Sequence, residues 1–224
     1  MKLYYHPAST VSRPVVLFAT ESRIPLEMQV VDLFTGEHTQ PPFDAVNPNH
    51  LVPVLEDGNF RLTESSAILK YLADKTDSPL YPKDLQQRAR VNERMDWVNT
   101  QLCRDFAYGF VYPQIFPSHK RRSDEAQQAT LQRGQERAQR WMKVLNDSIL
   151  GPGNNFVCGD AITIADHYAA AFVALGELTG STYAGYPNIR RWLDHMKALP
   201  SWKQVNAAID GYGATLERSA LLAV

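Results

Sequence analysis

A change of pattern at a proline-rich segment, residues 77–83, constrains the fold of this 224-residue chain more than any other feature. Before the segment, short strand-like runs alternate with helical spacing, whereas every periodic stretch after it is helical. Pro79 and Pro82 interrupt regular structure and favour a linker. We therefore expect two domains, residues 1–78 and 85–224, joined by a linker at residues 79–84.

The first half opens with a predicted β-α-β unit. Residues 2–5 form a short run with β propensity, and the apolar block 15–19 lies within a segment of helix length. Pro14 suits the first turn of that helix, where a missing N–H costs least. Apolar residues alternate over 27–31, which predicts a second strand that should run parallel to the first. Residues 35–50 predict a long loop with at most a short helix.

A β-hairpin and a helix complete this half. Residues 52–55 and 60–62 are apolar runs on either side of Asp57-Gly58, which is a strong hairpin signal. Helical spacing over residues 67–72 then predicts a helix. The order predicts a small mixed sheet with helices on its faces. No GxGxxG motif follows the first strand, which argues against a Rossmann domain.

The second half is predicted to be all-helical. Residues 86–103 and 124–150 have a helical period, and residues 151–155 break the chain. Thr163 and Asp166 match a capping box before the helical stretch 168–178. A further helix is expected over 187–199 and should end at Pro200.

Composition excludes several kinds of partner. Its 44% hydrophobic residues allow a proper core, while 23 basic and 24 acidic side chains give a net charge of -1. This balance leaves no excess of positive charge that would attract nucleic acid or an anionic membrane. No apolar run is long enough for a membrane span or a signal peptide. Cys103 and Cys158 are isolated, which suits a reducing cytoplasm, and no histidine spacing indicates a metal site.

Four motifs, in a fixed order, resemble those of the soluble glutathione transferases, in particular the serine-type phi and theta classes. They are residues 6–13 (HPASTVSR), residues 32–38 (DLFTGEH), residues 47–68 (from Asn47-Pro48 to LTESSAI) and residues 159–166 (GDAITIAD). The resemblance covers nearly the whole chain. It implies a thioredoxin-like N-terminal domain (β-α-β-α-β-β-α), an all-helical C-terminal domain and a homodimer. It also implies glutathione as co-substrate without a prosthetic group, and we expect a bacterial source.

The resemblance makes Ser9 the catalytic hydroxyl. A free thiol has a pKa of about 8.5, so only about 3% is ionised at pH 7. One hydrogen bond to the thiolate contributes about 1.5–3 kcal/mol, enough to lower the pKa by about two units. Thr10 and Ser12 are alternatives, with Tyr5 behind them, although Ser12 is also a candidate helix cap. Arg13 could help through its charge or form a surface ion pair.

Further residues are assigned to glutathione by the resemblance. The backbone of Val52 should pair with the cysteinyl unit like an added strand. Pro53 should be cis, the alternative being a trans proline that closes an edge strand. Glu64 and Ser65 should hold the γ-glutamyl end at a helix N-terminus, or else they merely cap that helix. Leu51 stands where relatives usually have Gln or Lys, so one polar contact is lost.

Two histidines enter the same prediction. His38 should face the glycine end of glutathione, the alternative being an exposed side chain, and His50 is a weaker candidate for the same region. A third histidine, His167, is a departure from the resemblance, because relatives have an apolar residue there that completes a hydrophobic staple.

The second substrate is expected to be a small hydrophobic electrophile. Aromatic residues near the end of a predicted helix are candidates for its pocket, although an aromatic stripe is also typical of a core: Phe106, Tyr108, Phe110, Tyr112 and Phe116. The predicted function is a glutathione transferase, with peroxide reduction as a side activity. The alternatives are a non-catalytic binding or regulatory module and a glutathione-dependent isomerase.

Overall fold

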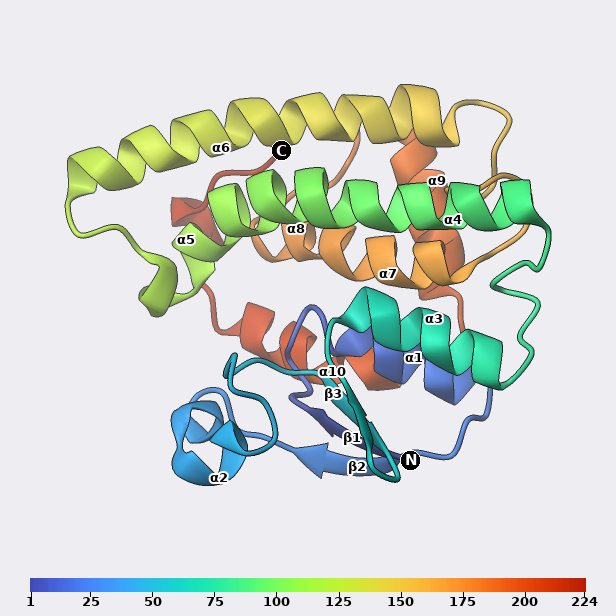
Figure 1. The fold of residues 1–224 in the computed structure, drawn as a ribbon. Helices are drawn as coiled ribbons and strands as arrows, with labels where there is room; N and C mark the ends of the chain where they lie inside the picture. The colour runs from blue at the N-terminus through green and yellow to red at the C-terminus, as the bar shows by residue number, and fades with distance from the viewer.

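The computed structural model describes all residues from 1 to 224 and divides into a sheet-containing half and a helical half (Figure 1). The elements of the first half are β1 (Lys2–Tyr5), α1 (Arg13–Glu21), β2 (Glu27–Val30), the 3-10 turn η1 (Glu37–Thr39), α2 (Pro41–Asp44), β3 (Val54–Asp57), β4 (Phe60–Leu62) and α3 (Ser65–Lys75). This order confirms the predicted thioredoxin-like arrangement, including a short helix within the loop at 35–50.

The sheet has the strand order β2-β1-β3-β4. Strands β1 and β2 are parallel, as predicted for a β-α-β unit, and β3 runs antiparallel to both β1 and β4. The hairpin turns at Gly58-Asn59, where Gly58 has φ +62°. Glycine adopts this backbone conformation without steric cost, which explains why the chain reverses there.

Successive residues of the central strands contribute side chains to two apolar clusters, one on each face of the sheet. Leu3 and Leu55 face the main core, whereas Val54 packs with Val52 and Phe43 in a small cluster on the opposite face. Strand β2 differs, since every residue in it is exposed. Its alternating apolar residues do predict the strand, but Met28 and Val30 remain 40% and 45% exposed.

The helical half contains more helix than the sequence predicts. Its elements are α4 (Leu85–Trp97), η2 (Val98–Val111), α5 (Tyr112–Ile115), the 3-10 turn η3 (Pro117–His119), α6 (Asp124–Val144), η4 (Leu145–Leu150), α7 (Ile164–Val173), α8 (Leu175–Leu178), α9 (Pro187–Lys197), α10 (Trp202–Ala214) and the 3-10 turn η5 (Arg218–Ala220). Elements η2 and η4 continue α4 and α6 in wider, π-type turns. None of the helices is long and apolar enough to cross a membrane.

Two helical stretches were missed by the sequence analysis. The predicted helix at 86–103 is confirmed, but it continues through η2 and α5 to Ile115. Helix α10 begins two residues after Pro200 and contains Gly211 and Gly213, both of which weaken a helical signal. Its burial of Val205 and Ile209 against the rest of the molecule stabilises it instead.

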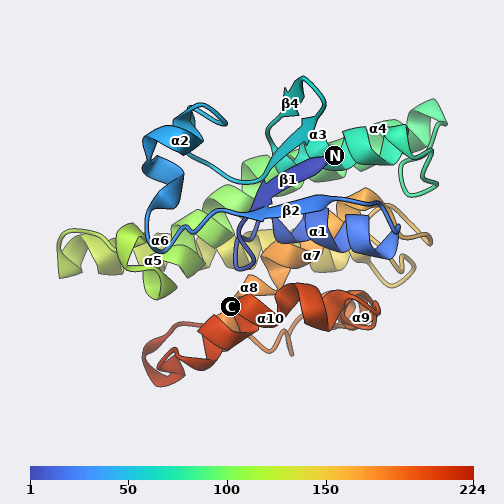
Figure 2. The same ribbon diagram turned by 90° about the horizontal axis from the view of Figure 1, so that it is seen from below.

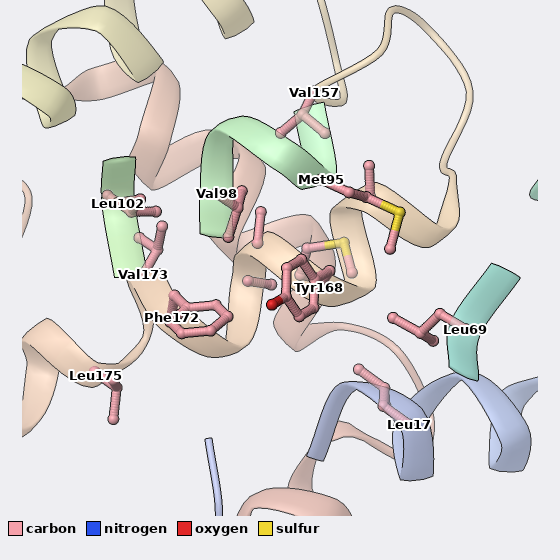
Figure 3. Packing of buried hydrophobic residues seen from close by; sticks show 14 of the residues in the cluster. Leu17, Leu69, Met95, Val98, Leu102, Val157, Tyr168, Phe172, Val173 and Leu175 are labelled. Atoms are coloured by element: carbon pink, nitrogen blue, oxygen red, sulfur yellow. The ribbon is translucent and has the colours of Figure 1, made fainter. Parts of the chain in front are cut away.

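One apolar core runs through both halves. A single cluster of 46 buried residues includes strand, α1, α3 and helical-half side chains, so the two halves share their stabilising interior. Leu17 of α1 and Leu69 of α3 approach Tyr168 and Met95 of the helical half (Figure 3). Helix α1 contacts α3, α7 and α10, and in Figure 2 it lies between α3 and α10.

The start of α7 confirms the predicted capping box. The Asp166 carboxylate accepts hydrogen bonds from the Thr163 N–H at 2.8 Å and from the Thr163 hydroxyl at 2.9 Å. It also accepts from Val157 N–H and Trp192 Nε1. These four donors tie the chain before α7 and helix α9 to one buried carboxylate.

His167 is buried at the interface of α1 and α7. Its ring lies edge-to-face against Phe18, with centroids 5.7 Å apart, and its Nδ1 is 3.1 Å from the Thr163 carbonyl oxygen. Burial lowers the pKa of His167, which favours the neutral ring that an apolar interface requires. The neutral imidazole therefore packs within the junction of the two halves.

Gly134 allows α6 to pack closely on η2. A Cβ atom at this position would collide with the Gly109 carbonyl and come within 3.1 Å of the Phe110 Cβ. Because backbone atoms cannot yield as a flexible side chain can, the two helices would have to separate.

We expect Gly134→Ala to lower the free energy of unfolding by about 2 kcal/mol, through overpacking that outweighs the higher helix propensity of alanine. Urea unfolding of both proteins measures the change. Gly153→Ala is the matched control, because nothing lies within 4 Å of a Cβ there. Equal stability of the two variants would show that the helix contact is not tight.

Candidate active site

The turn between β1 and α1 holds Ser9 at the start of a helix. The Ser9 Oγ accepts the Ser12 N–H at 3.2 Å, and its carbonyl accepts the Arg13 N–H at 3.1 Å. The half-buried Ser9 therefore caps the turn that leads into α1. Its O–H donates to no group of the chain, so this hydroxyl has a free donor at the positive end of a helix.

The two neighbouring hydroxyls are buried. Thr10 Oγ1 accepts a hydrogen bond from the Tyr112 hydroxyl at 2.8 Å, and Ser12 is fully buried with no hydrogen-bond partner for its Oγ. Ser12 occupies the N-cap position of α1, but its hydroxyl makes no capping bond, whereas the Ser9 Oγ accepts the Ser12 N–H. Burial also separates Thr10 and Ser12 from any ligand at the surface, which leaves Ser9 as the accessible hydroxyl.

Arg13 is not in a surface ion pair. Its side chain is 3% exposed, and its recorded partners are neutral, namely Asn206 Oδ1 in α10 and the Ala171 carbonyl in α7. The ion-pair alternative is therefore wrong, because the first turn of α1 packs directly against the helical half. Burial lowers the pKa of Arg13 to about 10, so the guanidinium stays charged at neutral pH.

The segment before β3 presents an open backbone edge. The Val52–Pro53 peptide bond is cis, as the resemblance predicted. The Val52 side chain is buried, while its N–H and C=O make no hydrogen bond within the chain. These two groups are free to pair with an extended ligand, which is the pattern of an added strand.

Leu51 lies beside this edge with its side chain 57% exposed. Its carbonyl accepts a hydrogen bond from Asn47 Nδ2 at 2.7 Å, so Asn47 fixes the loop. A leucine in place of the expected Gln or Lys therefore changes the side chain that a ligand would meet. The backbone of Leu51 is still fixed by its hydrogen bond from Asn47.

Glu64 stands immediately before α3 in an unusual backbone conformation. Its φ is +62°, its side chain is exposed, and the next residue, Ser65, is buried at the first position of the helix. For a residue other than glycine such a conformation costs about 1–3 kcal/mol, and it persists mainly at functional sites. The free N–H groups at this helix start provide a place for a carboxylate.

His38 and His50 are placed differently. His38 belongs to η1, is half-buried, and has no hydrogen-bond partner for its Nδ1. His50 instead pairs with Asp44, with Nε2 and Oδ1 2.5 Å apart. The contact of His38 with glutathione therefore stays a prediction, whereas His50 is engaged with Asp44 in its own loop.

His6 supports the serine turn and was not predicted. Its Nδ1 accepts the Ala8 N–H at 3.2 Å, its Nε2 is 4.0 Å from Asp32 Oδ1, and its carbonyl accepts the Ser9 N–H. Burial lowers the pKa of His6, which Asp32 partly opposes. Both ring nitrogens are directed at the protein, so His6 holds the turn in shape.

Two of the five aromatic residues predicted to line the electrophile pocket lie in the core, and the role of the other three stays a prediction. Phe106 and Phe110 are 0% exposed and stack on one another in the core, so they cannot line an open site. They occupy the inner face of η2, whereas Tyr108 is exposed, Phe116 is half-buried and Tyr112 is buried. The core interpretation is correct for the first two rings.

Rings from distant parts of the chain extend the surface-facing group. Phe34 is 64% exposed and packs edge-to-face on His6 at 5.0 Å, and it stacks on Tyr212 at 6.0 Å. Tyr212 in turn stacks on Phe116 at 5.4 Å. We call the combined set the aromatic wall: Phe34, Tyr108, Tyr112, Phe116, His119 and Tyr212. No sequence signal links Phe34, His119 and Tyr212, which meet only after folding.

The two cysteines are not suited to nucleophilic chemistry. Burial raises the pKa of Cys103 to about 12 and that of Cys158 to about 11, and both are free thiols. Their sulfurs stay protonated at neutral pH and are poor nucleophiles. The arrangement is therefore a hydroxyl site at a helix N-terminus, flanked by an open backbone edge and an aromatic wall.

The buried bond between Thr10 and Tyr112 joins the serine turn to the helical half. Burial raises the pKa of the Tyr112 hydroxyl, which keeps it a neutral donor. We expect a double-mutant cycle of Thr10→Val and Tyr112→Phe to give a coupling of about 1 kcal/mol in the free energy of unfolding. Tyr108→Phe is the control, since its exposed hydroxyl makes no bond within the chain. Additive effects in the cycle would contradict the assignment.

Comparison with known proteins agrees with this geometry. A family model described as the N-terminal domain of glutathione S-transferase matches residues 8–75, and the C-terminal domain model matches residues 93–200. Human glutathione S-transferase theta-1 is 34% identical over 206 residues, which cover 88% of this chain and 82% of the relative.

Two solved structures of human theta-class enzymes are also similar. Human glutathione transferase theta-2 in complex with glutathione shows 30% identity and a TM-score of 0.86, over 99% of this chain and 92% of that one. A human theta-class enzyme in complex with the glutathione conjugate of 1-menaphthyl sulfate also has 30% identity and a TM-score of 0.86, over 98% and 91%.

Proposed function

The chain belongs to the glutathione S-transferase family as a theta-like, glutathione-conjugating enzyme, and from this premise we propose that the Ser9 hydroxyl activates the glutathione thiol for attack on small hydrophobic electrophiles. The observation that carries this proposal is the free O–H donor of Ser9 at the start of α1. In the reaction the thiol proton passes to water, and the Ser9 O–H donates to the sulfur anion. The thiolate then forms a carbon–sulfur bond as the leaving group departs, or as an activated double bond accepts a proton.

The energetics suit a single neutral hydroxyl. Lowering a thiol pKa by about two units requires about 2.7 kcal/mol of preferential thiolate stabilisation. A hydrogen bond to a charged group contributes about 1.5–3 kcal/mol, and a helix N-terminus adds about 0.3–1 kcal/mol. Since Cys103 and Cys158 stay protonated, a mixed-disulfide mechanism through a protein thiol is disfavoured.

The proposed glutathione contacts follow the open groups of the site. Val52 pairs its free N–H and C=O with the cysteinyl unit, and the N-terminus of α3 at Ser65 receives the γ-glutamyl carboxylate. The exposed carboxylate of Glu64 attracts the ammonium of that unit, and His38 faces the glycine end. Leu51 offers no charge there, so we expect the glycine carboxylate to depend on His38.

Two further parts of the proposal concern partners and setting. We propose a homodimer in which the sheet half of one chain covers the helical half of the other, because Phe60 of β4 and Leu85 of α4 leave apolar surface exposed, the latter to 80%. We also propose a cytoplasmic location, because two free cysteines suit a reducing compartment. Peroxide reduction is a proposed side activity. The thiolate attacks one peroxide oxygen, the O–O bond breaks, and the alcohol leaves after taking up a proton, which gives the sulfenic acid of glutathione. A second glutathione thiol then displaces water from that sulfur and forms the disulfide.

The Ser9 assignment predicts a change in thiol ionisation. Ultraviolet absorbance of the thiolate, followed against pH with bound glutathione, should show an apparent pKa about two units below that of the free thiol. In Ser9→Ala we expect the pKa to rise by about one to two units, since the hydrogen bond to the thiolate is lost. Above its lowered pKa the thiol bound to the wild type is ionised, whereas the thiol bound to Ser9→Ala ionises only at higher pH. The variant therefore loses activity most near neutral pH and regains part of it as the pH rises.

Ser12→Ala is the matched control, because its buried hydroxyl has no partner. A raised pKa in Ser12→Ala with none in Ser9→Ala would overturn the assignment. Failure of the wild type to be retained on immobilised glutathione would favour a binding module without glutathione chemistry. Turnover of a maleyl-type substrate in preference to alkyl and aryl halides would favour the isomerase.

The aromatic wall predicts a preference for flat electrophiles. A related theta-class enzyme was solved with a conjugate of 1-menaphthyl sulfate, whose aromatic group suits such a surface. We expect Phe34→Ala to raise KM for a benzyl halide about three- to tenfold, because a ring contact contributes about 0.5–1.5 kcal/mol. Steady-state kinetics with a methyl halide is the control and should be unchanged. An equal effect on both halides would mean that Phe34 supports the fold only.

A further inference from the structure

His6 precedes the serine turn and receives two of its backbone N–H groups. The side chain is 8% exposed, its Nδ1 accepts the Ala8 N–H at 3.2 Å, and its carbonyl oxygen accepts the Ser9 N–H at 3.0 Å. A side-chain acceptor that binds the N–H two residues later is the pattern of an Asx turn, which is made here by an imidazole. The ring therefore fixes the backbone that carries the Ser9 hydroxyl.

The bond from Ala8 determines which ring nitrogen of His6 carries the proton. A nitrogen that accepts a hydrogen bond needs a free lone pair, so the neutral ring carries its proton on Nε2. Nε2 lies 4.0 Å from Oδ1 of Asp32. This tautomer therefore satisfies both sides of the ring, with an acceptor toward the serine turn and an N–H toward a carboxylate.

Asp32 shapes the loop that carries Phe34. Its Oδ1 accepts the N–H groups of Phe34 at 2.8 Å and Thr35 at 3.3 Å, and its own N–H donates to Glu37 Oε2 at 2.7 Å. Phe34, a member of the aromatic wall, lies edge-to-face on the His6 ring with centroids 5.0 Å apart. One imidazole therefore contacts both the serine turn and the loop that supplies a ring of the wall.

We propose that His6, neutral and protonated on Nε2, is a positioning residue that couples thiol activation at the serine turn to the electrophile site at the aromatic wall. The inference rests on the proposed function of Ser9 and concerns the control of that same site. His6 acts through its neighbours, because its Nδ1 holds the turn and its ring supports Phe34.

Protonation of His6 opposes this arrangement. The imidazolium carries a proton on each nitrogen, so Nδ1 can no longer accept the Ala8 N–H. Burial lowers the pKa of His6, and two titratable groups act on it as well: Asp32 raises it and His38 lowers it. Since the net shift is downward, the neutral ring is favoured at neutral pH. The turn is held above the pKa of His6 and is released as the pH falls through it.

Two substitutions separate the contacts of His6. His6→Asn keeps an acceptor for the Ala8 N–H, because asparagine makes the same turn through its Oδ1, but it removes the ring and its titration. His6→Leu keeps an apolar side chain of similar size and removes the acceptor. The apparent pKa of the bound glutathione thiol, followed by thiolate absorbance, should keep its wild-type value in His6→Asn. In His6→Leu it should rise by about one unit, since the turn is no longer held.

The pH profile and the kinetics give two further readouts. Below both pKa values, log kcat/KM of the wild type should fall with a slope steeper than about one, because the thiol and His6 each take up a proton. In His6→Asn the slope should be about one, measured over the range in which circular dichroism shows both proteins folded. His6→Asn should also raise KM for a benzyl halide about two- to fivefold, because Phe34 loses its ring contact.

His195→Leu is the matched control, because this histidine of α9 is exposed and takes part in neither contact, and it should change none of the three readouts. A thiol pKa that is the same in wild type and both His6 variants, or raised equally in both, would overturn the inference and leave the proposed function standing. Equal slopes in wild type and His6→Asn, or an unchanged KM, would contradict it even if His6→Leu does not fold. A wild type that does not lower the thiol pKa would refute the proposed function and the inference together.

Discussion

The packing of α1 between the two halves determines most of what this protein can do. The helix begins directly after the serine turn, and its first residue, Arg13, is held by Asn206 of α10 and by the Ala171 carbonyl of α7. Phe18 meets His167 of α7 further along the same helix. The position of the Ser9 hydroxyl is therefore fixed by the helical half as much as by the sheet, and the bond from Tyr112 to Thr10 reinforces it.

This arrangement supports the proposed role of Ser9 as a hydrogen-bond donor to the glutathione thiolate. A neutral hydroxyl contributes little when it must be reoriented, but Ser9 is already positioned by the Ser12 N–H that its Oγ accepts. The positive φ of Glu64 concentrates strain at the proposed peptide-binding edge, near the unpaired backbone of Val52. The backbone strain at Glu64 thus destabilises the site locally, whereas burial of apolar side chains in the shared core stabilises the molecule as a whole.

The same helix start carries a second consequence. Because Arg13 must enter the interface for α1 to pack, the molecule buries a charge with neutral partners only. A cavity beside it is lined by three further cations, Lys197, Lys203 and Arg218, by the carboxylates of Glu177 and Asp210, and by apolar side chains. The packing of α1 on the helical half therefore places a buried cation beside a cavity, close to the serine turn.

Short-range patterns in the sequence were sufficient for the sheet half, the hairpin at Gly58, the capping box at Thr163 and most helices, because strand alternation and helix capping depend on neighbours a few residues apart. The motif order also located Ser9, Val52 and Glu64, whose roles stay predictions, as do the domain boundaries and the bacterial source. Only the tertiary structure revealed the burial of Thr10, Ser12 and Arg13, the core positions of Phe106 and Phe110, and helix α10.

The aromatic wall and the cavity beside Arg13 likewise depend on folding. Phe34, Phe116 and Tyr212 come from three distant segments, and their stacking has no counterpart in the sequence pattern. The local sequence determines which residues can form a turn, a strand or a helix. Whether a side chain then faces solvent, a ligand or the core depends on which distant element packs against it, and that is set by long-range burial.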